Sequence, residues 1–67
     1  MNFTYVQSTD IAAIAKKLDN LVIKFNSGGI YEYKGAAVEF ENLLNASSKG
    51  KYFHENIKNK YPYLKIN

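Results

Sequence analysis

The sequence predicts an α+β fold: a small antiparallel β-meander of three or four strands, with two C-terminal helices packed on one face. Three observations predict it. Residues 21–34 have the pattern of two strands around a glycine turn, residues 36–46 carry an apolar stripe with helical spacing, and residues 51–60 repeat that spacing before a proline. Because a chain of 67 residues can bury only one core, residues 1–67 are predicted to form a single domain.

Residues 8–19, with the sequence STDIAAIAKKLD, fit either a helix or a strand. Their first side chains are typical helix caps, and the apolar residues that follow have helical spacing. However, Asp19-Asn20 is also a plausible two-residue hairpin turn. Pairing about that turn would set three pairs side by side: Leu18 with Leu21, Lys16 with Ile23, and Ile14 with Phe25. The residues alone leave both structures open.

The hairpin over residues 21–34 follows from strand and turn composition. LVIKF, residues 21–25, is β-branched and aromatic, and IYEY, residues 30–33, alternates apolar with polar side chains. The NSGG segment between them contains two glycines that can take positive φ, as hairpin turns often require.

Two helices are predicted in the C-terminal half. AAVEFENLLNA, residues 36–46, has a broad apolar stripe and should end between residues 45 and 48. KYFHENIKNK, residues 51–60, should form the second helix and end at Pro62, which cannot donate a backbone hydrogen bond. In it, Phe53 and Ile57 lie four residues apart and so share a face. The alternating tail PYLKI predicts an additional edge strand.

Composition limits the class of protein. With 46% hydrophobic and 15% aromatic residues, the chain is too rich in core formers for a disordered tail, and its apolar runs are too short for a membrane span. The N-terminal MNFTYVQSTD lacks the features of a signal peptide, so we expect a cytoplasmic location and no membrane partner. Because no cysteine can form a disulfide, a homo-oligomer is the expected way to stabilise so small a core.

Positive charge gathers in the last third of the chain. From Lys49 onward the chain contains five lysines and one acidic residue, whereas the first 48 residues contain four lysines and five acidic residues. This asymmetry favours an anionic partner such as a phosphate group, and a solvated lysine-rich face is the alternative.

Catalysis and metal binding are poorly supported by the residue types present. His54 is the only histidine, there is no cysteine nucleophile, and the scattered carboxylates show no ligand spacing. We therefore expect no catalytic residues, no metal and no cofactor. Gly28-Gly29 lacks the lysine and hydroxyl residues of a phosphate-binding loop, so a turn is the better interpretation.

Two features predict a ligand site. Tyr31 and Tyr33 project from the same face of a strand and could stack on a nucleobase, although packing against the helix of residues 37–46 is the alternative. In the segment ASSKGKYF, hydroxyls and backbone N–H groups would meet near a helix N-terminus, where an anion is favoured. The simpler alternative is a loop in which Ser48 caps the helix and Gly50 relaxes the turn. The predicted ligand-binding residues are Tyr31, Tyr33, Ser47, Ser48, Lys49, Gly50, Lys51, Phe53 and Lys58.

The combination of LVIKF, G-x-Y-x-Y, L-L-N-A, S-K-G-K-Y-F and a following I-K-x-x-Y resembles the KTSC domain. Members of that family occur alone in bacterial and phage proteins and at the C-terminus of some lysyl-tRNA synthetases. The likeness extends from about residue 6 to residue 66, and it implies that residues 11–18 form a strand. The sequence departs from the family at Ile14-Ala15-Lys16, where I-G-Y is usual, and at Ala36-Ala37, where Val-Pro is usual.

The resemblance implies binding rather than chemistry. The synthetase context suggests RNA, and small phage-borne members are candidates for binding nucleotide signals. The function expected here is a non-enzymatic module that binds a phosphate-bearing nucleotide, such as a phage-type protein that sequesters cyclic nucleotide or dinucleotide immune signals. The alternatives are an RNA-binding module and a protein–protein interaction domain with no nucleotide ligand.

Overall fold

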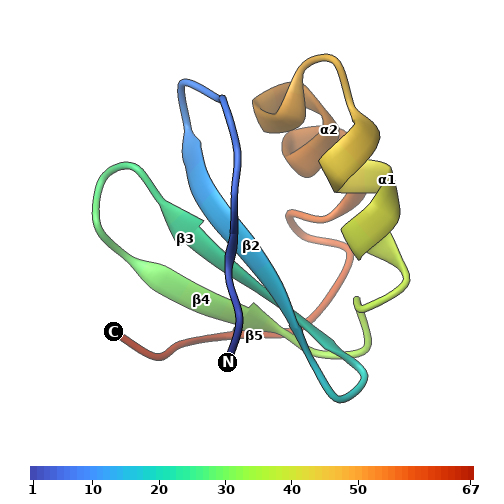
Figure 1. Cartoon of the computed structure of the whole chain (residues 1–67). Helices are drawn as coiled ribbons and strands as arrows, with labels where there is room; N and C mark the ends of the chain where they lie inside the picture. The colour runs from blue at the N-terminus through green and yellow to red at the C-terminus, as the bar shows by residue number, and fades with distance from the viewer.

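A computed structural model describes residues 1–67 as one antiparallel sheet and two helices (Figure 1). The sheet contains five strands in the order β1-β2-β3-β4-β5, so each strand pairs with its neighbours along the chain. The α+β class and the meander are therefore confirmed, with more strands than the three or four predicted. In chain order the elements are β1 (Thr4–Tyr5), β2 (Ile11–Lys17), β3 (Asn20–Phe25), β4 (Ile30–Tyr33), α1 (Glu39–Asn45), α2 (Lys49–Asn56) and β5 (Tyr63–Lys65).

Residues 11–17 form a strand, so the helix considered for this segment is wrong. The predicted turn at Asp19-Asn20 is also wrong, because Lys17 pairs with Asn20 and Ile14 pairs with Ile23. The two turn residues are Leu18, which takes a φ of 56°, and Asp19. The register is thus displaced by two residues from the predicted one, which keeps Ile14 and Lys16 on their predicted face. Leu18 instead lies in the turn and is 91% exposed, and an irregularity between Ile11 and Ala13 brings Ile11 into the core with Ile14.

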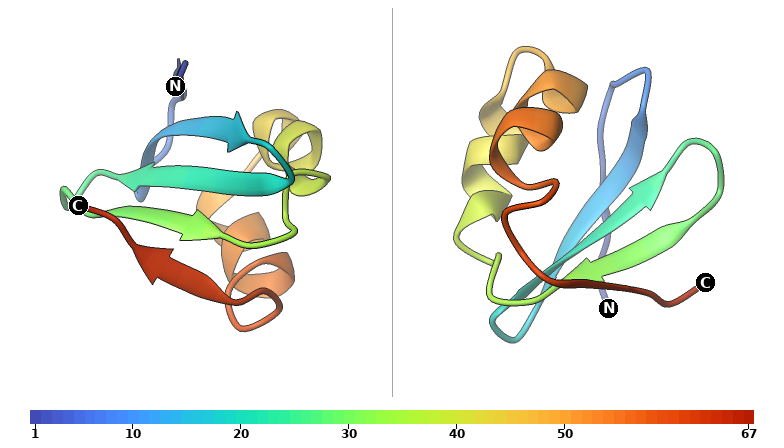
Figure 2. Two further views of the ribbon diagram at one scale, coloured as in Figure 1. Left: turned by 90° about the horizontal axis from the view of Figure 1, so that it is seen from below. Right: turned by 180° about the vertical axis from the view of Figure 1, so that it is seen from behind.

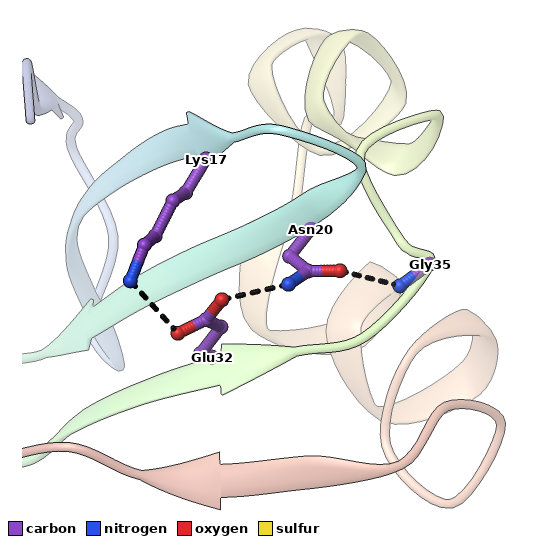
Figure 3. A network of polar contacts seen from close by, with 4 residues as sticks. All are labelled: Lys17, Asn20, Glu32 and Gly35. Atoms are coloured by element: carbon purple, nitrogen blue, oxygen red, sulfur yellow. Dashed lines mark hydrogen bonds and ion pairs between the residues drawn. The ribbon is translucent and has the colours of Figure 1, made fainter.

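Asn20 explains why the turn lies where it does (Figure 3). Its side-chain amide donates to the Glu32 carboxylate at 2.7 Å and its amide oxygen accepts from the Gly35 N–H at 2.9 Å. Lys17 Nζ lies 3.6 Å from the other Glu32 oxygen. Hydrogen bonding by Asn20, with added attraction from Lys17, holds the pKa of Glu32 below its usual value even though partial burial opposes this. These contacts keep Asn20 in the strand.

The helices differ from their predicted limits. α1 begins at Glu39, three residues after the start of its apolar segment, and ends at Asn45, within the expected region. α2 begins at Lys49 rather than Lys51. Gly50 therefore lies in the first turn of the helix, and Ser48 occupies the N-cap position without making a side-chain capping bond. The interpretation of Gly50 as a loop residue is wrong.

The prediction that the second helix ends at Pro62 is also wrong. The helix ends at Asn56, and the N–H groups of Ile57 and Lys58 both donate to the carbonyl of Phe53. Asn59 then takes a φ of 67°, the left-handed conformation that commonly closes a helix. The chain turns there and runs to β5, which forms the predicted edge strand.

Both helices cover the same face of the sheet, as the two views in Figure 2 show. Phe53 and Ile57, the predicted apolar pair of α2, are both buried. The core lies between this face and the helices; its nine buried residues are Ile11, Ile14, Leu21, Ile23, Tyr33, Ala36, Leu43, Phe53 and Ile57. Neither helix has the length and apolar character needed to cross a bilayer.

Candidate functional site

Five aromatic rings from three strands and one helix meet at one end of the covered face. Tyr31 and Tyr33 alternate along β4 and so share a face, and Tyr63 in β5 pairs directly with Tyr33. Ring centroids of Tyr63 lie 5.8 Å from Tyr31 and 5.7 Å from Tyr33. The ring centroid of Phe53 in α2 lies 5.3 Å from that of Phe25 and 5.6 Å from that of Tyr33, and both ring pairs are edge to face. We call these five residues the aromatic cluster.

The aromatic cluster lines a cavity of about 300 Å³, which we call the aromatic cavity. Three polar residues complete its lining: Ser27, Lys58 and Asn59. Tyr33 is 5% exposed and belongs to the floor of the cavity, whereas Tyr63 is 59% exposed and stands at its rim. The cavity thus combines flat apolar surfaces with one ammonium group and several hydrogen-bonding groups.

The two tyrosines of β4 differ in their burial. Tyr33 packs in the core, where its ring lies edge to face with Phe53 of α2 and shares the buried cluster with Leu43 of α1. Tyr31 is only partly buried and remains available beside Tyr63. Of the predicted ligand-binding residues, Tyr31, Tyr33, Phe53 and Lys58 are brought together in the aromatic cavity.

The other predicted residues line a separate hollow. Residues 47–51 face Gln7, Ser8, Thr9 and Asp10 from the loop before β2, and none of the nine lining residues is apolar. Lys49 Nζ donates to the carbonyl of Ala46 at 3.0 Å, so its ammonium is turned back onto the backbone of its own segment. We call this region the polar hollow.

Asp10 already places a negative charge at the N-terminus of α2. A Cβ added to Gly50 would come within 2.5 Å of Asp10 Oδ2, so only a glycine leaves room for this carboxylate as it lies. A helix N-terminus favours an anion, and here the protein supplies one from its own chain. A phosphate in the polar hollow would have to share that position with Asp10 or displace it.

A third hollow connects the two regions. Phe25, Ser27 and Phe53 line both it and the aromatic cavity, and Thr9 and Asp10 line both it and the polar hollow. Asn26 and His54 complete its lining. The three hollows therefore adjoin one another along α2, aromatic at one end and polar at the other; we call this row of hollows the α2 groove.

Glu39 holds the segment that carries Lys58 and Asn59. Its carboxylate accepts hydrogen bonds from the hydroxyls of Tyr52, at 2.6 Å, and Tyr61, at 3.0 Å. Burial alone would raise the pKa of Glu39, but these hydrogen bonds and one from Asn42 outweigh it and hold the pKa below its usual value. The start of α1 is thereby tied to α2 and to the chain that leads into β5.

Sequence reasoning missed four lining residues: Phe25, Ser27, Asn59 and Tyr63. A signal for Tyr63 was present, because the predicted edge strand PYLKI would place alternate residues on one face if it paired with β4. Ser27 and Asn59 lie in turns, where no periodic pattern indicates the direction of a side chain. No group of three or more His, Cys, Asp or Glu side chains lies close enough together to hold a metal ion.

Tyr33 is expected to make stability fall at alkaline pH. Burial, with smaller contributions from Tyr31 and Tyr63, raises the pKa of Tyr33 from 10.0 to about 12. A raised folded-state pKa favours folding below the unfolded pKa, and this contribution is lost as pH rises through the folded pKa. The free energy of unfolding from urea titrations should therefore decline between pH 10 and 12. Tyr33→Phe should decline less over that range, and equal declines in both proteins would contradict this account.

Comparisons with known proteins agree on one family. The family described as KTSC domain matches residues 7–61. A lysine–tRNA ligase from Trichormus variabilis is 47% identical over 47 residues, which are 69% of this chain and 8% of the ligase. One from Nostoc punctiforme is 40% identical over 52 residues, 76% of this chain and 9% of the ligase. The chain thus spans less than a tenth of the length of these relatives.

A solved structure extends the likeness to the whole fold. The crystal structure of a KTSC domain protein from Yersinia pestis has a TM-score of 0.90 and 33% sequence identity, and the likeness covers 98% of this chain and 97% of that one.

Proposed function

Since the chain belongs to the KTSC domain family, we propose that it is a non-enzymatic nucleotide-binding module that takes a nucleobase into the aromatic cavity. The observation that carries this proposal is the grouping of Tyr31 and Tyr63 beside Lys58 in one cavity. Stacking of a base on aromatic side chains contributes about 1–3 kcal/mol per base in single-strand binders. A volume of about 300 Å³ is at the lower end for ligand pockets, which suits one base rather than a large cofactor.

The phosphate would be held by Lys58 at the same cavity. A lysine ammonium neutralises phosphate as a point charge, and no arginine is present in the chain to form a bidentate contact. Ser27 and Asn59 would add hydrogen bonds at the rim. Because none of these groups is placed as a nucleophile with a base beside it, the proposed role is binding without turnover.

The α2 groove favours a ligand with more than one nucleotide unit. A cyclic or linear dinucleotide could stack one base in the aromatic cavity and extend past His54 towards Lys51 in the polar hollow. Binding without turnover would suit sequestration of a nucleotide signal, the role that the resemblance implies for small phage-borne members.

RNA binding is the second candidate function. The lysine–tRNA ligases that share this domain are named for a reaction with tRNA, and the same groove could hold an unpaired stretch of RNA. The two candidates differ in salt dependence, because each phosphate neutralised along a polynucleotide releases counterions.

A thermal-shift screen of mono-, di- and cyclic nucleotides and a short single-stranded RNA, at low and high salt, tests the proposal. A ligand at a hundred times its Kd should stabilise the fold by about 2.7 kcal/mol, a shift of several degrees for a domain of this size. A salt-resistant shift with one small nucleotide supports the cavity, and a salt-sensitive shift with RNA alone supports the second candidate. No shift with any of them would favour the protein–protein interaction domain instead.

A substitution pair tests whether the ligand extends along the groove. Lys49→Ala with Lys51→Ala should weaken binding of a dinucleotide several-fold but leave binding of the matching mononucleotide unchanged, because only the longer ligand reaches the polar hollow. The thermal midpoint without ligand should change little, since Lys51 is exposed and Lys49 makes one contact to the backbone. Equal losses for both ligands, measured by calorimetric titration, would place the phosphate in the polar hollow rather than beside Lys58.

A further inference from the structure

The outer edge of β5 is an unpaired strand edge beside the aromatic cavity. β5 is the last strand of the sheet and pairs only with β4 (Figure 2). All three of its residues are exposed, including Tyr63 at 59% and Leu64 at 55%. Such an edge presents free backbone groups that can pair with another strand.

The hydrogen bonds of β5 show which backbone groups are free. Ile66 N–H donates to the carbonyl of Ile30, and Lys34 N–H donates to the carbonyl of Pro62, both at 2.8 Å. In an antiparallel ladder, alternate residues turn their N–H and C=O groups to the same side. Residues 62, 64 and 66 therefore face β4, and Tyr63 and Lys65 direct theirs to the open edge.

We propose that two copies of this chain pair through β5, antiparallel and centred on Leu64. In this register Tyr63 of each copy lies opposite the partner's Lys65, so the outward N–H and C=O groups of both residues are all satisfied. The arrangement needs no sequence beyond β5 itself, because the edge is complementary to its own copy under a two-fold rotation.

Two neighbouring registers are less favourable. Centring on Lys65 would set two lysines directly opposite each other, which is destabilising in a strand pair. Centring on Tyr63 would place Tyr61 opposite the partner's Lys65. The pairing would then have to extend beyond β5, past Pro62, to a residue that is already partly buried in its own chain. The register centred on Leu64 has neither fault. It places the exposed Leu64 against its own copy on the face opposite the helices, and on the other face it places the partner's Lys65 beside Tyr63.

The pairing would also complete the ligand site. Directly opposite residues in a strand pair point to the same face, so the partner's Lys65 would stand beside Tyr63 at the rim of the aromatic cavity. Each cavity would then gain a second ammonium group from the neighbouring copy. This consequence rests on the proposed function, whereas the pairing itself does not.

Single cysteines test the register in the absence of any nucleotide, because the natural chain has no cysteine. Residues at the centre of a non-hydrogen-bonded pair have Cα atoms about 4.5 Å apart, within the disulfide range of about 4.4–6.8 Å. Leu64→Cys should therefore form a covalent dimer under mild oxidation. Lys65→Cys is the matched control on the same exposed strand; its two copies would lie about 7–8 Å apart or more and should not cross-link.

Sedimentation equilibrium of the wild-type chain completes the experiment. A mass of twice 7.6 kDa, with cross-linking of Leu64→Cys alone, supports the proposal. Cross-linking of Lys65→Cys alone, of both variants equally, or of neither variant would overturn it. A wild-type chain that stays monomeric at all concentrations would overturn it as well, whatever the nucleotide screen shows.

Discussion

Replacing Phe53 with alanine is expected to leave the domain largely unfolded at room temperature. Phe53 is 6% exposed, and its ring joins α2 to Phe25 of β3 and Tyr33 of β4. Removing a buried phenylalanine side chain typically costs about 3–5 kcal/mol. A core of this size rarely supplies more than about 3–5 kcal/mol in total, so little stability would remain.

Urea unfolding followed by circular dichroism measures this loss. Val38→Ala is the control, because Val38 is 71% exposed and its truncation should change the free energy of unfolding by less than about 0.5 kcal/mol. If Phe53→Ala lost less than about 1 kcal/mol, the contact between α2 and the aromatic cluster could not be a main support of the fold.

Replacing Tyr63 with alanine is expected to weaken nucleotide binding by about 1–3 kcal/mol, roughly 5- to 150-fold in Kd. The ring stands at the rim of the aromatic cavity and offers the most accessible stacking surface there. Because Tyr63 is 59% exposed in an edge strand, its loss should affect folding far less than the loss of Phe53.

Tyr5→Ala is the matched control for this prediction. Tyr5 is also an exposed tyrosine in an edge strand, at 67%, but it lies in β1 and lines none of the hollows described. Calorimetric titration of both variants with the same nucleotide should show a large loss of affinity for Tyr63→Ala alone. Similar losses for both would indicate contacts that do not depend on the cavity.

The hairpin of β3 and β4 was predictable because its pattern is local. Alternation and the glycine turn are both visible within residues 21–34. The turn between β2 and β3 was not predictable. Two registers of this strand pair place the apolar side chains on the same face, and they differ only in which residues form the turn. Asn20 decides between them through hydrogen bonds to Glu32 and Gly35, partners that no short window includes.

The start of α2 was missed for a related reason. Glycine is a poor helix former, which favoured a loop at Gly50. The structure places Gly50 in the helix beneath Asp10, forty residues earlier in the chain. The same long-range contact brings a negative charge into the hollow where a phosphate site was expected. Charge counting along residues 47–51 could not detect it.

The candidate site was predictable in part. Spacing within β4 indicated that Tyr31 and Tyr33 share a face, and spacing within the second helix indicated that Phe53 faces the core. That these rings join Tyr63 and Lys58 around one cavity depends on how β5 and the end of α2 fold back onto the sheet. Residues 47–51 were expected at the same site, but they lie at the other end of the α2 groove.

The most direct test is a solution NMR titration of the wild-type chain with the nucleotide that gives the largest thermal shift. A base stacked in the aromatic cavity should move the ring-proton signals of Tyr31 and Tyr63 and leave those of Tyr5 unchanged. Shifts confined to residues 47–51, or to the opposite face of the sheet around the exposed Leu64, would contradict the proposal that the aromatic cavity is the nucleotide site.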